Sequence, residues 1–174
     1  MMRVASARDI AAIGHLMRAS ARGLCEPFYD AQQTTSVERY VAVLDDQLVT
    51  DGTYYVVDGD DAELAACGGW SFRDKLFTGT DTSGTVRPLD PAREAARVRA
   101  MFVHPARARR GLGRAILARS EADARAAGFT RVELFATLPG EPLYAACGYT
   151  VIERRELVLP DGVAIGGAHM AKQL

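Results

Sequence analysis

The sequence predicts one α/β domain around a mixed sheet, and three observations support this prediction. The chain has 174 residues, which is enough for one domain with a sizeable core but too few for two ordinary domains. Hydrophobic periodicity gives the element order α-α-β-β-β-α-β-α-β-β. No internal repeat, low-complexity segment or interdomain linker is visible, so residues 1–174 are expected to form a single domain.

Composition and charge exclude several classes of protein. The chain is 48% hydrophobic and 25% charged, as is ordinary for a soluble globular protein, and its formal charge of −1 argues against nucleic-acid binding through whole-protein charge. Cys25, Cys67 and Cys147 are widely spaced, which favours a reducing compartment over a disulfide framework or a metal site. Neither a signal peptide nor a run of roughly 20 apolar residues is visible. We therefore expect a cytoplasmic protein without a membrane partner.

Two amphipathic helices are predicted near the start of the chain. Asp9 has the position of an N-cap, and apolar residues follow it at helical spacing as far as Gly23. Residues 25–30 have the composition of a loop. Thr35 and Glu38 have the spacing of a capping box, which predicts that the second helix begins there.

A hairpin and a long loop are predicted next. Residues 53–57 are a run of β-forming residues, and residues 62–70 follow them after an acidic turn, as in a β-hairpin. Residues 77–93 carry glycines and prolines among Thr, Ser and Asp. A loop of that length is usually functional or mobile.

The second half of the chain alternates strands with helices. Gly128 has the position of a helix stop, and Gly148 ends a short helix in the same way. The predicted elements are a strand at 96–103, a helix at 111–127, a strand at 131–137, a short helix at 142–147 and a closing hairpin at 149–172.

The segment VHPARARRGLGRA, residues 103–115, lies where a strand passes into a helix. A helix start exposes unpaired N–H groups and carries partial positive charge. Gly111 and Gly113 remove side chains that would keep a bulky anion away from those N–H groups. The pattern favours polyphosphate binding, and a tight turn with a solvated basic face is the alternative. Four nearby arginines add full positive charges: Arg107, Arg109, Arg110 and Arg114.

Two common phosphate-binding motifs do not fit this segment. A P-loop requires Gly-Lys-Ser/Thr, which is missing, and the dinucleotide fingerprint requires a third glycine where the chain has Ile116. The segment MFVHPARARRGLGRAIL, followed later by EPLYAACGY, instead resembles the GNAT superfamily of N-acetyltransferases. There the signature Gln/Arg-x-x-Gly-x-Gly/Ala binds the pyrophosphate of acetyl-coenzyme A. The motifs cover Arg97 to Tyr149; the first signature position is Ala108, whose role Arg107 or Arg109 can take.

The resemblance implies a GNAT-like mixed, largely antiparallel central sheet with helices on both faces. Strands 96–103 and 131–137 would be parallel and splayed, with the pantetheine arm between them. In that arrangement Met101 and Val103 would bind the arm through their main chain, and Phe102 would turn to the core. The residues implied to bind acetyl-coenzyme A, as acyl-donor substrate, are Met101, Phe102, Val103, Arg109, Arg110, Gly111, Leu112, Gly113 and Arg114.

Tyr144 matches the family's tyrosine that protonates the departing coenzyme A thiolate, and packing of a half-buried aromatic ring is the alternative. A tyrosine with a pKa near 10 is protonated at neutral pH and can donate. The main-chain amide of Met101 would stabilise the oxyanion. For the general base, Glu133, Glu141 and a water relay remain open, with the water relay favoured; His104 is interpreted as a turn residue.

Arginines stand where several family members have a Glu or His base. Strict alternation would put Arg97, Arg99, Met101 and Val103 on one face, so both arginines would point toward the acceptor. We therefore predict an acceptor with an anionic group beside its amine, although a bulge would reverse the alternation. Tyr29, after the first helix, is a further candidate for the acceptor pocket.

The function predicted from these residues is transfer of an acetyl group from acetyl-coenzyme A to a primary amine of a small molecule. No metal, nucleic acid or membrane is expected to take part, and a homodimer is left open. An amino acid, a polyamine, an antibiotic and a peptide N-terminus all remain open as acceptors. The alternative from another class is a non-catalytic acyl-coenzyme A sensor with the same fold, which the missing strand carboxylate favours and Tyr144 opposes.

Overall fold

The computed structural model describes residues 1–59, 63–76 and 87–174, and these form a seven-stranded sheet in the order β1-β2-β3-β4-β5-β7-β6. Neighbouring strands are antiparallel except β4 and β5, which are parallel. The mixed, largely antiparallel sheet predicted from the sequence is thus confirmed. The strands are β1 (Met2–Val4), β2 (Tyr54–Asp58), β3 (Leu64–Ser71), β4 (Ala96–Val103), β5 (Arg131–Thr137), β6 (Thr150–Val158) and β7 (Ala164–Gln173).

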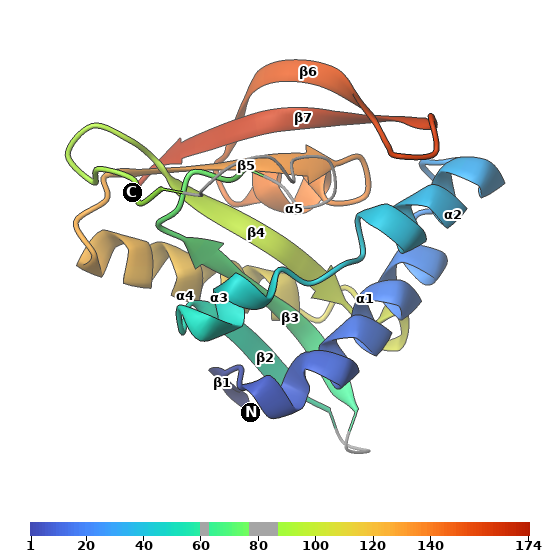
Figure 1. The fold of residues 1–174 in the computed structure, drawn as a ribbon, viewed down its shortest axis with the longest axis horizontal. Coiled ribbons are helices and arrows are strands. Elements are labelled where there is room, and N and C mark those ends of the chain that lie inside the picture. The colour runs from blue at the N-terminus through green and yellow to red at the C-terminus, as the bar shows by residue number, and fades with distance from the viewer. Residues whose placement is uncertain (60–62, 77–86) are drawn as a thin grey trace.

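Helices cover both faces of the sheet (Figure 1). On one face, α4 and α5 pack over a core that contains Ile116 and Trp70. On the other face, α1 and α2 enclose a second core with Ile13 and Tyr54. None of the described helices is long and apolar enough to cross a membrane. The helices are α1 (Ile10–Leu24), α2 (Ala31–Tyr40), α3 (Asp46–Thr50), α4 (Leu112–Ala126) and α5 (Glu141–Ala146).

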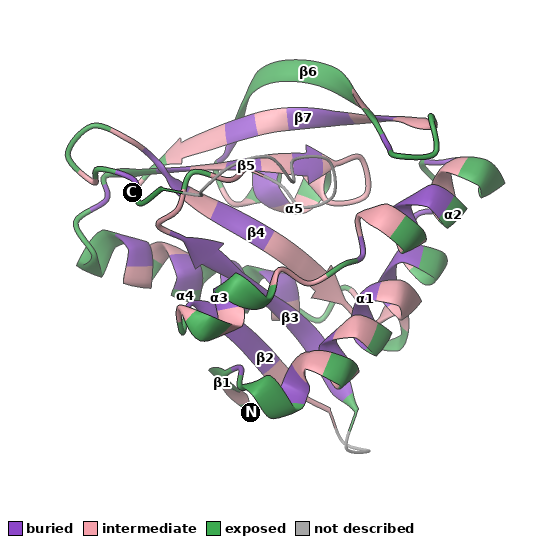
Figure 2. Ribbon diagram, viewed as in Figure 1, coloured by how far each residue is buried: buried purple, intermediate pink, exposed green. Residues whose placement is uncertain are grey.

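Strand β6 forms one edge of the sheet and is exposed along its length (Figure 2). Its apolar residues Val151, Ile152 and Val158 are 40%, 56% and 64% exposed. The charged stretch Glu153–Glu156 separates these apolar side chains. In the part of the chain that the structure describes, β6 pairs with β7 alone.

The elements of the second half lie close to where periodicity predicts them, and β4 and β5 have the predicted bounds. Gly128 and Gly148 follow α4 and α5 with positive φ angles of 92° and 89°, as predicted for helix stops. Four short elements, β1, α3 and the 3₁₀ turns at Ala7–Asp9 and Pro105–Arg107, were not predicted because they are too short to show a period. Of the predicted loop at 77–93, residues 77–86 lie outside the described residues.

The predicted start of α2 at Thr35 is wrong, because the capping box lies one turn earlier. The backbone N–H of Gln33 donates to Asp30 Oδ1 at 2.8 Å, and the N–H of Asp30 donates to Gln33 Oε1 at 3.1 Å. These two bonds begin the helix at Ala31 and place Thr35 inside it.

Asp9 occupies the predicted N-cap position of α1, but its side chain makes no capping bond to that helix. The Asp9 carboxylate instead accepts hydrogen bonds from the N–H of Ser6 at 2.8 Å and from the Arg3 guanidinium at 2.8 and 2.9 Å. The bond from Arg3 holds the pKa of Asp9 well below its usual range. This carboxylate therefore closes the turn before the helix.

Tyr29, between α1 and α2, joins three segments that are distant in sequence. Its hydroxyl donates to the carbonyl of Gly166 in β7 at 2.6 Å and accepts from the N–H of Leu138 at 2.9 Å. Burial raises the pKa of Tyr29 to about 12, so the hydroxyl keeps its proton at neutral pH. Nearby, Gln33 Nε2 donates to the carbonyl of Ala164 at 2.8 Å. These bonds fix the α1–α2 connection to the β6–β7 hairpin.

Tyr29→Phe is expected to lower the free energy of unfolding by about 1–3 kcal/mol, because it leaves the N–H of Leu138 and the carbonyl of Gly166 without their partner. Urea denaturation would measure the loss. Tyr40→Phe is the matched control, since the Tyr40 hydroxyl makes no hydrogen bond to any residue that the structure describes. Equal stability of both variants and the unsubstituted chain would contradict the structural role of Tyr29.

Candidate active site

The two parallel strands open into a large cavity. Strands β4 and β5 pair at their beginnings, Ala96 with Val132 and Arg97 with Glu133. Beyond these pairs the strands diverge (Figure 1). A cavity of about 690 Å³ lies at the divergence and is lined by residues of β4, β5, α1, α2, α4 and α5. The splayed parallel pair predicted from the sequence is present, and it places the cavity at the centre of the fold.

Strand β4 contains a bulge at the level of the cavity. Cys67 of β3 pairs with Phe102 and Gly69 pairs with Arg99, so two residues of β4 face Gly68. Ala100, one of the two, has a φ angle of 53°, and its carbonyl accepts a bond from the Tyr54 hydroxyl at 2.6 Å.

Gly68 makes room for this bulge. A Cβ atom at Gly68 would lie 2.3 Å from Met101 Sδ and 3.2 Å from Met101 Cα, so a larger residue there would displace the Met101 side chain and crowd the backbone of the bulge. The tyrosine on one side and the glycine on the other therefore hold the bulge in place.

The bulge reverses the strict alternation predicted for β4. Met101 and Val103 pack against the core on the α4 face, whereas Ala100 and Phe102 pack against the core on the α1 face. The prediction that Arg99 shares a face with Met101 is therefore wrong. Phe102 does turn to a core, as predicted.

The start of α4 lines the cavity and presents backbone N–H groups that no side chain caps among the described residues. Gly111 occupies the N-cap with a φ angle of 82° and offers no capping side chain, so the N–H groups of the first turn have no side-chain cap. Nothing lies within 4 Å of where its Cβ would be, so the glycine is required by backbone conformation. Arg109 also has a positive φ angle, 63°.

Gly113 has a different role from the one predicted. It is buried, and a Cβ atom there would lie 2.9 Å from Leu143 Cδ2. The missing side chain therefore lets α4 pack closely against α5, which carries Tyr144. Gly113 and Leu112 still line the cavity.

The predicted arginine cluster divides into two groups. Arg109 and Arg114 are exposed and line the cavity, whereas Arg110 is exposed but does not line it. Among the described residues, no carboxylate lies within ion-pair distance of these three side chains. Arg109 and Arg114, with the N-terminus of α4, can therefore bind an anionic group such as a pyrophosphate.

Tyr144, on α5, also lines the cavity. It is 8% exposed, and its ring packs edge to face against Tyr149 with 5.7 Å between the ring centroids. Burial raises the pKa of Tyr144 above its ordinary value. Its hydroxyl makes no hydrogen bond within the part of the chain that the structure describes. The side chain is thus a proton donor available to a ligand.

The two carboxylates considered as general bases are engaged elsewhere. Glu133 accepts from Arg97 at 2.7 Å and lies 3.1 Å from His169 Nε2. Glu141 binds Arg154, which holds the pKa of this carboxyl below its usual value. Among the described residues that line the large cavity there is no Asp, Glu, His or Lys.

His104 caps the turn after β4, where its Nδ1 accepts from the N–H of Ala106 at 3.2 Å. This is the turn role that the sequence predicts for it.

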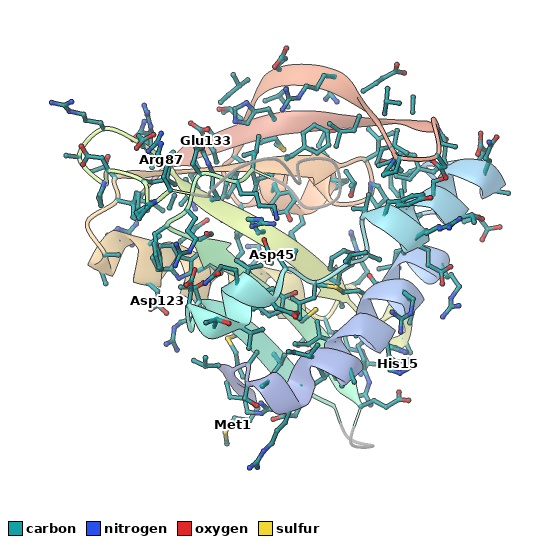
Figure 3. The ribbon with its side chains drawn as sticks, viewed as in Figure 1. Met1, His15, Asp45, Arg87, Asp123 and Glu133 are labelled. Carbon is teal, nitrogen blue, oxygen red and sulfur yellow. The ribbon has the colours of Figure 1, made fainter. Side chains whose placement is uncertain are left out.

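The three predicted acceptor residues separate in the structure. Arg99 lines the large cavity and is 4% exposed, and its guanidinium donates to Asp45 at 3.0 Å. Arg97 instead binds Glu133 and Asp74, and Tyr29 makes the bonds described above; neither lines the cavity. Figure 3 shows Asp45 over the middle of the sheet and Glu133 in a separate position.

Sequence reasoning missed Asp45, the partner of Arg99 from the connection between α2 and α3. It also missed Lys75, which binds the same carboxylate at 3.0 Å. No local pattern marks either residue, because the contacts join positions far apart in the chain.

Comparisons with known proteins agree with this geometry. A model described as the acetyltransferase (GNAT) family matches residues 19–149. A GCN5-related N-acetyltransferase structure from Rhodopseudomonas palustris is 17% identical with a TM-score of 0.74, and the match covers 100% of this chain and 95% of the other. A search of curated proteins finds no match.

Two further structures have the same fold. The PaiA N-acetyltransferase from Thermoplasma acidophilum, in complex with coenzyme A, is 12% identical with a TM-score of 0.66, covering 100% of this chain and 98% of the other. The ribosomal-protein-alanine N-acetyltransferase from Brucella melitensis is 15% identical with a TM-score of 0.63, covering 100% and 99%. The family model spans most of the sequence and includes the whole of β4, α4 and Tyr144. The chain belongs to the GNAT acetyltransferase family and is an acyltransferase.

Proposed function

We propose that this enzyme transfers an acetyl group from acetyl-coenzyme A directly to the primary amine of a small molecule that also carries an anionic group. The observation that carries the proposal is that one cavity joins the uncapped start of α4, two arginines and the Tyr144 hydroxyl. The coenzyme A complex of the PaiA N-acetyltransferase, which has the same fold, supports the choice of donor.

The donor side of the cavity suits a long anionic thioester. The N–H groups at the start of α4, together with Arg109 and Arg114, would bind the pyrophosphate. Met101 and Val103 line the cavity along the splayed edge of β4, where their main chain would hold the pantetheine arm. The thioester then lies between the β4 bulge and α5.

Tyr144 would serve as the acid in the transfer step. The amine nitrogen attacks the thioester carbonyl carbon, the C–S bond breaks, and the thiolate takes the proton from the Tyr144 hydroxyl. The amine gives its own proton to water, since the described lining holds no side-chain base. The phenolate recovers a proton from solvent before the next turnover.

Cys25 is the thiol that lines the cavity, and its state favours direct transfer. Burial raises the pKa of Cys25 to about 11, so the thiol stays protonated at neutral pH and is a weak nucleophile. An acyl-enzyme intermediate on this cysteine is therefore disfavoured.

The test is release of free coenzyme A from acetyl-coenzyme A over a panel of amino acids, polyamines, aminoglycosides and peptides. Release that depends on a primary amine, together with an acetylated product in the mass spectrum, is expected. Trimethylated forms of the same amines are the matched controls, because their nitrogen cannot attack. Tight coenzyme A binding in calorimetry without release for any amine would contradict catalysis and favour a sensor.

A further inference from the structure

A second, smaller cavity of about 250 Å³ borders the first, and the side chain of Arg99 lines both. This small cavity lies between the start of α3 and the segment that follows β3. No step of the proposed transfer uses it. Its lining residues are Asp45, Gln47, Leu48, Ser71, Arg73, Lys75 and Arg99.

The small cavity is richer in cations than in carboxylates. Of its described lining residues, three are cationic and Asp45 alone is a carboxylate. A single oxygen of Asp45, Oδ2, accepts from both Lys75 Nζ and Arg99 NH1 at 3.0 Å. Arg73 is bound separately by both oxygens of Asp51, at 2.6 and 2.8 Å.

Burial makes this arrangement of charges favourable for an anion. Arg99 is 4% exposed and Ser71 is 1% exposed, so water screens the cluster poorly. Buried cations are unfavourable unless anions or hydrogen-bond acceptors surround them. A guanidinium has five N–H donors, so Arg99 can bind Asp45 and a ligand carboxylate together. The small cavity is thus suited to a carboxylate between Lys75 and Arg99.

One wall of the large cavity is apolar. This wall is formed by residues of α1, α2 and the β6–β7 hairpin. Leu76, the residue that follows Lys75 in the chain, also belongs to it. Phe28, also in this lining, is 45% exposed and marks the open side. The apolar residues of this wall include Leu24, Phe28, Val41, Leu76, Leu157 and Leu159.

Resting on the proposed function, we propose that the acceptor is an α-amino acid with an apolar side chain. Its carboxylate binds between Lys75 and Arg99, its side chain packs against the apolar wall, and its amine meets the thioester at the β4 bulge. Arg99 and Met101 are separated on β4 by the single bulge residue Ala100, so the two ends of the acceptor site lie close together along the strand. A carboxylate and an amine on the same carbon suit so short a span, whereas a long polyamine or an aminoglycoside lacks the carboxylate.

The first test compares matched acceptors in the coenzyme A release assay. L-Leucine and L-phenylalanine are compared with their amides and with isopentylamine and phenethylamine, which lack the carboxylate. Loss of the carboxylate is expected to lower kcat/KM by about 10- to 100-fold, the range for losing charge-assisted hydrogen bonds. L-Aspartate tests the apolar wall and should be a poor acceptor. Amines that perform as well as the amino acids would overturn the proposal.

The second test uses variants of Lys75, which is only partly buried and so tolerates change better than Arg99. Lys75→Met is expected to raise KM for L-leucine about 10-fold while KM for isopentylamine and acetyl-coenzyme A stays unchanged. Lys75→Arg keeps the charge and should restore most of the affinity. Arg119→Met, which removes a cation paired with Asp123 on α4, is the remote control. An equal rise for L-leucine and isopentylamine would contradict the carboxylate site.

Calorimetry separates failure of this inference from failure of the proposed function. With coenzyme A present, L-leucine should bind, and Lys75→Met should weaken that binding. If no compound supports amine-dependent release of coenzyme A, the proposed function is refuted. In that case the effect of Lys75→Met on L-leucine binding still tests whether the carboxylate site exists. Release with isopentylamine but no preference for L-leucine would leave the proposed function intact and refute the amino-acid acceptor.

Discussion

Tyr144→Phe is expected to lower kcat by about 100- to 10,000-fold, the contribution typical of a positioned proton donor. The substitution removes one hydroxyl and keeps the ring that packs against Tyr149. Since that hydroxyl makes no hydrogen bond to the described residues, its loss should leave the fold unchanged. KM for acetyl-coenzyme A should also stay within a few-fold of its original value, because the proposed pyrophosphate site lies at the start of α4, on another element. Steady-state kinetics and a thermal melt would measure these effects.

Tyr149→Phe is the matched control for this variant. It removes a hydroxyl from the neighbouring ring, and Tyr149 does not line the cavity. Because burial raises the pKa of Tyr144 above its ordinary value near 10, the wild-type rate should show no decline from tyrosine ionisation below that pH. A Tyr144→Phe variant that keeps its full kcat, or a Tyr149→Phe variant that loses as much, would refute the acid role.

The double variant Arg109→Gln/Arg114→Gln is expected to raise KM for acetyl-coenzyme A by about 100-fold or more, because a hydrogen bond to a charged group contributes about 1.5–3 kcal/mol. Both side chains are exposed and unpaired within the described residues, so their replacement should not cost stability. KM for the acceptor should change little. Initial rates over a range of donor concentrations would measure the effect, and rising salt should weaken donor binding in the wild type more than in the variant.

Arg110→Gln removes the same charge from the same loop but from a side chain that does not line the cavity. It should raise KM for acetyl-coenzyme A only a few-fold, because losing one positive charge weakens the long-range electrostatic attraction between the loop and the anionic donor. If Arg110→Gln were as damaging as the double variant, net charge rather than the position of Arg109 and Arg114 would govern binding. From the sequence alone the four arginines of this segment cannot be distinguished, and only the fold shows which of them line the cavity.

Local patterns predicted the second half of the chain well because its elements are long and periodic. β4, α4 and β5 follow one another with clear strand or helix periods and glycine stops, and the structure matches their bounds closely. The start of α2 was predicted wrongly because two residue pairs had capping-box spacing, and the pair at Asp30 and Gln33 is also bonded to the β6–β7 hairpin. Such a tertiary contact is invisible in a local window.

Which residues at the start of α4 line the cavity could largely be predicted, whereas the environment of Arg99 could not. Gly111 and the arginines around it lie in one continuous segment, so a single motif describes them. The environment of Arg99 depends on the β4 bulge, which Tyr54 of β2 and Gly68 of β3 fix. It also depends on Asp45, which reaches Arg99 across 54 positions in the chain. Contacts of this kind depend on the topology of the sheet, so the hydrophobic periodicity of the sequence cannot predict them.

The exposed edge strand β6 has a consequence for how copies of this protein meet one another. The backbone groups on its outer side could form hydrogen bonds to a strand of another molecule. The exposed side chains of Val151, Ile152 and Val158 would stabilise that pairing through hydrophobic contacts. The charges of Glu153–Glu156 oppose this, since an arriving strand would have to strip water from them. Neutralising that stretch would turn the edge into a seed for aggregation. Hydration of these charged side chains, rather than another strand, thus protects this edge of the sheet from pairing.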